Sequence, residues 1–92
     1  MTNNPLFLTI RQYLLEKNIR RAAVFGSYAR NEAAEQSDID LLIDADGLTL
    51  FDILRMEEEL QQLTGRKMDL VEYKAIKSTI RERVLADQVP LL

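Results

Sequence analysis

Three aspartates, Asp38, Asp40 and Asp69, are the residues of this sequence best suited to metal-assisted chemistry. Side chains two apart on a strand project from the same face, so a strand over residues 38–43 would bring the carboxylates of Asp38 and Asp40 together. Aspartate is disfavoured in strands and like charges repel, a penalty that bound Mg²⁺ would remove. The alternative stays open that Asp38 closes a turn and Asp40 faces water, because a bare Asp-x-Asp pair is common.

Asp69 is the candidate for a third carboxylate. Two-metal phosphoryl and nucleotidyl transfer works best when a third acid completes the site that activates the acceptor oxygen. Asp69 lies in the apolar string Met68-Asp69-Leu70-Val71, where an acid is costly unless it faces a cation or a cleft. The alternative is an edge-strand acid that faces solvent. Asp44 and Asp46 are weaker rivals, since turn formation before Gly47 explains them.

Gly26 and Ser27 follow an apolar run and predict a tight turn that could bind phosphate. Backbone N–H groups and the Ser27 hydroxyl would face the phosphate oxygens, and a helix that begins at Ser27 would add its dipole. Arg30, about one helical turn further along, would place a positive charge near a triphosphate. A plain strand-to-helix turn with Ser27 as N-cap is the alternative, and it is compatible with phosphate binding.

Composition excludes several other classes of site. The chain has no cysteine and no histidine, so disulfides, thiolate metal sites, cysteine nucleophiles and imidazole bases are absent. A net charge of −3 argues against broad binding of nucleic acid, which requires a basic face. Arg66 and Lys67 form one of three basic pairs that could still touch a phosphate. With no signal peptide and no long apolar run, we expect no membrane association and a cytoplasmic protein.

The pattern of apolar residues predicts a small α/β domain with the element order αβαβαβα. The 92 residues leave room for one domain, over 1–92, with a mixed sheet of three or slightly more strands packed against helices. Thr49 and Asp52 suggest a capping box, Gly65 a helix stop, and Ser78 a helix cap. The apolar tail 89–92 is expected to pack on the domain itself. The expected helices are 5–18, 28–34, 49–64 and 78–89, and the expected strands are 21–25, 38–43 and 67–73.

Taken together, Gly26-Ser27, ten intervening residues and Asp38-Ile39-Asp40 resemble the signature of the polymerase-β-type nucleotidyltransferase superfamily. The longer strings, residues 25–30 and 37–42, resemble its minimal nucleotidyltransferase branch. The likeness extends over nearly the whole chain, and no position of the motif is missing.

The resemblance implies roles for the candidate residues. Asp38, Asp40 and Asp69 would bind two Mg²⁺ ions, and Gly26 and Ser27 would hold the triphosphate of ATP. It also implies an antitoxin that transfers AMP from ATP to a tyrosine of a HEPN-domain ribonuclease toxin. A domain of this size has little room for an acceptor pocket, which is compatible with a protein acceptor.

Two alternatives remain at this stage. The chain could be a catalytically silent module that inhibits its partner by binding alone, or a nucleotidyltransferase that acts on a small molecule or on the end of a nucleic acid. The acidic balance and short length count against the second alternative. The retention of all three carboxylates counts against the first.

Overall fold

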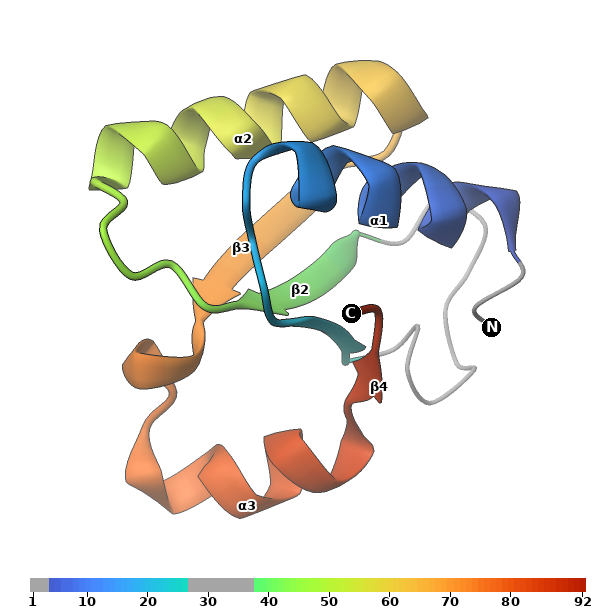
Figure 1. The fold of residues 1–92 in the computed structure, drawn as a ribbon. Helices are drawn as coiled ribbons and strands as arrows, with labels where there is room; N and C mark the ends of the chain where they lie inside the picture. Colours follow the sequence, from blue (N-terminus) through green and yellow to red (C-terminus); the bar gives the residue numbers. More distant parts are fainter. Residues whose placement is uncertain (1–3, 27–37) are drawn as a thin grey trace.

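The computed structural model describes residues 4–26 and 38–92. The expected helix over 28–34 therefore lies outside the described residues. In the described part of the chain, four strands form one mixed sheet between two helical layers (Figure 1). The elements are α1 (Pro5–Glu16), β1 (Ala22–Phe25), β2 (Ile39–Ile43), α2 (Leu50–Thr64), β3 (Met68–Glu72), the short 3₁₀ helix η1 (Tyr73–Ala75), α3 (Ser78–Asp87) and β4 (Val89–Pro90).

The strand order is β3-β2-β1-β4. β1 runs antiparallel to both β2 and β4, whereas β2 and β3 are parallel and are connected through α2. The predicted α/β fold with a mixed sheet slightly larger than three strands is confirmed. β3 lies at the edge of the sheet, so one side of its backbone has no partner among the strands that the structure describes.

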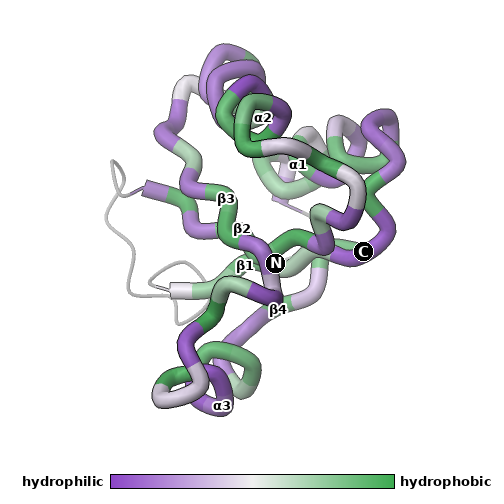
Figure 2. Tube along the Cα trace, turned by 90° about the vertical axis from the view of Figure 1, so that its left-hand side faces the viewer, coloured by the Kyte–Doolittle hydropathy of each residue, from purple (hydrophilic) through white to green (hydrophobic). Residues whose placement is uncertain are grey.

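α1 and α2 cover one face of the sheet, and α3 lies against the other face (Figure 1). Figure 2 shows that α2 alternates between hydrophilic and hydrophobic segments along its turns, as a helix with one buried face must. The hydrophobic core lies between α1, α2 and the sheet. Its fully buried side chains include Ile10, Leu14, Ile39, Leu41, Ile43 and Leu60.

The ends of α2 follow the sequence prediction closely. The Thr49 hydroxyl accepts from the backbone N–H of Asp52, and the Asp52 carboxylate accepts from the N–H of Thr49 at 2.9 Å. This reciprocal pair satisfies two donors that a helix start leaves unpaired. Gly65 ends the helix with φ +70°, a left-handed conformation that favours glycine.

The C-terminal region differs from the prediction in two respects. Ser78 was expected to cap α3, but it is the first helical residue, and the cap residue Lys77 makes no side-chain bond to the helix. α3 contains no buried residue, and Ile80 on this helix is 46% exposed. The short strand β4 was not predicted, because two residues that include a proline give almost no strand signal.

The apolar tail does pack on the domain, as expected. Leu91 is 5% exposed and belongs to the core cluster, and its N–H donates to the carbonyl of Ala22 at 2.9 Å. None of the helices in residues 4–26 and 38–92 is long and apolar enough to span a bilayer.

Candidate active site

Asp40 and Asp69 are brought together by the register of the parallel strands β2 and β3, in which they are direct partners. Ile39 and Leu41, the neighbours of Asp40 on β2, are fully buried in the core, whereas both aspartates are partly exposed. Because side chains alternate along a strand, both carboxylates project from the face opposite α1 and α2. The structure therefore places two of the three predicted carboxylates side by side at one end of the sheet.

Gly26 lies directly beside Asp40. It follows Phe25, the last residue of β1, which pairs with Asp40 across the antiparallel ladder. Gly26 has φ +72°, and a Cβ atom at this position would lie only 2.5 Å from Oδ2 of Asp40. Only glycine therefore satisfies both the backbone conformation and the close approach of the carboxylate. The predicted tight turn after β1 begins here.

Asp38 occupies the position just before β2, and its carboxylate Oδ2 lies 3.8 Å from Nζ of Lys67. Lys67 holds the corresponding position just before β3, so the parallel register places the two residues opposite each other. The side chains are 47% and 65% exposed, respectively, and such an ion pair contributes at most about 1 kcal/mol. Sequence reasoning considered Lys67 only as a phosphate contact, because strand register is not visible in a single sequence.

The donor set suits Mg²⁺, a hard cation that prefers oxygen ligands. Asp40 and Asp69 present carboxylate oxygens on one face, and Gly26 leaves the space beside Asp40 free of a side chain. Within the described ranges no three acidic side chains stand close enough together to form a metal-binding group. The ligand set of Asp38, Asp40 and Asp69 stays a prediction. Ser27 and Arg30, which were predicted to bind phosphate, lie outside the described residues.

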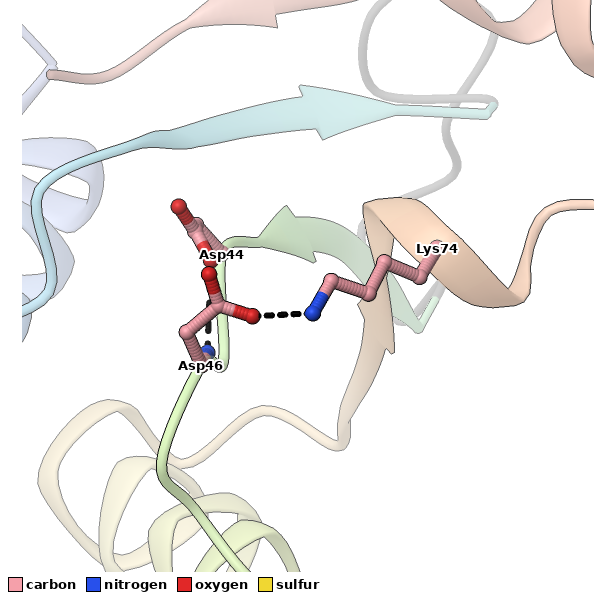
Figure 3. Close-up of polar contacts among 3 residues, drawn as sticks. All are labelled: Asp44, Asp46 and Lys74. Carbon is pink, nitrogen blue, oxygen red and sulfur yellow. Dashed lines mark hydrogen bonds and ion pairs between the residues drawn. The ribbon is translucent and has the colours of Figure 1, made fainter.

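Asp44 and Asp46 form a separate acidic pair after the opposite end of β2 (Figure 3). Oδ1 of Asp44 accepts from the N–H of Asp46 at 3.2 Å, and the Asp46 carboxylate accepts from the ammonium of Lys74. This contact with Asp46 raises the pKa of Lys74. These bonds agree with the interpretation that the two acids serve a turn.

Comparisons with known proteins extend over most or all of the chain. The sequence model of the family described as "Polymerase beta, Nucleotidyltransferase" matches residues 9–92. A protein of Methanocaldococcus jannaschii that is provisionally named a protein adenylyltransferase is 38% identical over 93 positions, which cover both chains completely.

Two solved structures share the fold. A crystal structure of a toxin–antitoxin with AMP-PNP superposes with a TM-score of 0.82 at 21% identity, covering 94% of this chain and 72% of the other. A structure of the tri-AMPylated Shewanella oneidensis HEPN toxin in complex with its MNT antitoxin gives a TM-score of 0.77 at 20% identity. It covers all of this chain and 72% of the other. By the match of residues 9–92 to the family model and by its identity to the Methanocaldococcus jannaschii protein, the chain belongs to the polymerase-β-type nucleotidyltransferase family.

Proposed function

We propose that this chain is an antitoxin that transfers AMP from ATP to a tyrosine hydroxyl of a HEPN-domain ribonuclease toxin in the cytoplasm. The observation that carries the nucleotidyl-transfer step is the register pairing of Asp40 with Asp69, with Gly26 against Asp40. The choice of ATP and of a protein acceptor rests on relatives. One is named for protein adenylylation, and two neighbours in fold are toxin–antitoxin structures, one with AMP-PNP and one with an AMPylated HEPN toxin.

In this proposal the residues divide into two groups. Asp38, Asp40 and Asp69 hold two Mg²⁺ ions, which when bound would neutralise charge on the phosphates and lower the pKa of the acceptor hydroxyl. The backbone of Gly26 and Ser27, together with Arg30, binds the triphosphate through N–H groups and a guanidinium. These two groups of residues orient the α-phosphate toward the acceptor oxygen.

The reaction that this arrangement supports is an in-line displacement. The tyrosine oxygen forms a bond to the α-phosphorus while the bond from that phosphorus to the bridging oxygen breaks, and pyrophosphate leaves. Asp69 is the carboxylate placed to assist removal of the hydroxyl proton, which explains how a chain without histidine can carry out the step.

The test uses α-labelled ATP, Mg²⁺ and the product of the adjoining gene, provided that this gene encodes a HEPN-type protein with an Arg-x4-His-x-Tyr string. The parent chain is compared with Asp38→Asn/Asp40→Asn. The matched control is Asp44→Asn/Asp46→Asn, which changes the net charge equally but lies at the other end of β2. We expect label on the partner with the parent and the control, and none with the site variant.

The outcomes separate the competing functions. Label that disappears only in Asp38→Asn/Asp40→Asn supports protein nucleotidylation by this carboxylate site. A stable complex without label from any chain would instead favour an antitoxin that inhibits by binding alone. Label on a small molecule but not on the partner would show that the acceptor is a small molecule rather than a protein.

A further inference from the structure

A backbone N–H group of the edge strand β3 donates a hydrogen bond to a side chain of α2. Oε2 of Glu57 on α2 accepts a hydrogen bond from the backbone N–H of Leu70 at 2.8 Å. Glu57 is partly buried, and its helix neighbours Met56 and Leu60 anchor that turn of α2 in the core. The carboxylate is therefore held against the strand by a well-packed part of the helix.

The position of this bond follows from the register of the sheet. The N–H of Ile39 donates to the carbonyl of Lys67 at 2.9 Å, so the backbone groups of Lys67 face β2. Backbone groups alternate in direction along a strand, so those of Asp69 also face β2 and those of Leu70 face the open edge. Among the described strands none lies on this side of β3, and Glu57 supplies the acceptor for the N–H of Leu70.

The bond acts on the peptide group that links Asp69 to Leu70. This group is planar, so fixing its N–H fixes the plane and with it the backbone dihedral ψ of Asp69. β2 holds the backbone of Asp69 on one side, and Glu57 holds the following N–H on the other. Glu57 therefore helps to fix the backbone that carries the Asp69 side chain.

Given the proposed function, on which this inference rests, we propose that Glu57 is a positioning residue for Asp69. In this role it acts through the backbone that follows Asp69, and it keeps the carboxylate of Asp69 aligned with that of Asp40. Displacements near 1 Å in such a site cost about 100-fold in rate. A loosened edge should therefore lower kcat and weaken Mg²⁺ binding while KM for ATP changes little.

The test compares four single variants of the full chain. Glu57→Ala removes the acceptor, Glu57→Asp keeps the charge but shortens the side chain, and Glu57→Gln keeps an acceptor oxygen without the charge. Glu58→Ala alters the exposed neighbouring acid on the same helix and serves as the matched control. If Glu57→Ala does not fold, Glu57→Asp still tests whether Glu57 positions Asp69.

Three measurements decide the matter. Hydrogen exchange reports the Leu70 amide, a Mg²⁺ titration follows the carboxyl ¹³C resonance of Asp69, and the transfer assay gives kcat and KM. In Glu57→Ala and Glu57→Asp we expect faster exchange at Leu70, Mg²⁺ binding weakened about three- to tenfold, and kcat lowered about tenfold or more. Glu57→Gln should remain within about threefold of the parent, because an amide oxygen also accepts hydrogen bonds.

The Mg²⁺ titration separates this inference from the proposed function. If no chain transfers AMP, the proposed function fails, yet weaker Mg²⁺ binding in Glu57→Ala than in Glu58→Ala would still support positioning. Faster exchange at Leu70 with unchanged Mg²⁺ binding and unchanged kcat would overturn the inference. Glu57 would then only stabilise the edge strand β3. An Asp69 resonance that does not respond to Mg²⁺ in the parent would overturn it as well.

Discussion

Asp40 and Asp69 are direct partners across the parallel strands β2 and β3, so two carboxylates project side by side from one face of the sheet. Like charges directly opposite each other destabilise a strand pair by about 0.2–1 kcal/mol. A cation bound between the carboxylates would relieve this repulsion. The proposed site therefore affects stability as well as activity.

Asp69→Asn should raise the stability of the metal-free chain, because it removes one charge of the opposed pair. We expect a rise in Tm of about 2–4 °C in EDTA, which corresponds to about 0.5 kcal/mol for a domain of this size. Mg²⁺ at ten times its Kd should stabilise the parent by about 1.4 kcal/mol and the variant by much less. Calorimetry with and without Mg²⁺ measures both effects. A variant less stable than the parent in EDTA would contradict the repulsion argument.

Gly26→Ala should abolish transfer out of proportion to its effect on stability. The φ of +72° is strained for alanine, at a cost of about 1–2 kcal/mol, and the new methyl group would push the Asp40 carboxylate aside. Gly47→Ala is a matched control, since Gly47 has φ +83° but nothing within 4 Å of a Cβ atom. Urea unfolding should show similar losses for both variants, and only Gly26→Ala should lose activity. Equal activity in the two variants would argue against a role for Gly26 in the site.

The parts of the fold that follow from local chemistry could be predicted from sequence. The Thr49–Asp52 capping box and the left-handed Gly65 each depend on residues within a few positions, and both are confirmed. The acidic residues Asp40 and Asp69 could also be selected as candidates from the sequence, because acids in apolar strands are unusual. The pairing of Asp40 with Asp69 could not be predicted from the sequence, because it depends on strand order and on a parallel register set by packing.

Apart from the cap of α3, the relations that were not predicted from sequence are long-range. Glu57 contacts Leu70 through a side chain that spans from helix to edge strand, and an acid on a helix face gives no signal of such a bond. The same holds for the ion pair of Asp38 with Lys67. β4 was missed because its pairing with β1, rather than its own two residues, defines it as a strand.

The capping box predicts a specific loss of stability in acid. The N–H of Thr49 donates to the Asp52 carboxylate and holds the pKa of Asp52 below its usual value. A lowered folded pKa means that the cap contributes fully above the unfolded pKa of about 3.9 and loses its contribution as pH falls through the folded pKa. Asp52→Asn should therefore be less stable than the parent at pH 6, and the difference should shrink toward pH 3.

Urea unfolding at several pH values measures this difference. Glu58→Gln, an exposed acid on the same helix, is the control and should follow the parent at each pH. A stability gap between Asp52→Asn and the parent that stays constant from pH 6 to pH 3 would contradict the capping argument.

The hydroxyl of Tyr13 donates to Glu59 and joins α1 to α2. This bond lowers the pKa of Glu59, and burial, together with the same bond, raises the pKa of Tyr13. Tyr13→Phe keeps the buried ring but leaves Glu59 without this donor, so the pKa of Glu59 should rise toward its usual value. We expect a stability loss of about 1 kcal/mol, and an NMR titration of the Glu59 carboxyl checks the pKa. An unchanged Glu59 pKa would show that the bond does not persist in solution.

Tyr73 connects α3 to the rest of the domain. The guanidinium carbon of Arg21 lies 4.0 Å from the centre of its ring, its hydroxyl donates to Gln88 at 3.1 Å, and its carbonyl accepts from Arg81 at 3.0 Å. α3 itself contains no buried residue, so these contacts supply much of what holds the helix in place. A helix held in this way should open locally without unfolding of the core.

Tyr73→Leu should loosen α3 while α2 stays closed. Loss of the cation–π contact and of the hydroxyl bond together should lower the local stability of α3 by about 1–2 kcal/mol, which speeds amide exchange there about five- to thirtyfold. Tyr73→Phe retains the ring over Arg21 and should give a smaller increase. Hydrogen exchange read by NMR distinguishes the helices. Exchange that rises equally in α2 and α3 would contradict this prediction. It would mean that Tyr73 stabilises the whole domain rather than α3 alone.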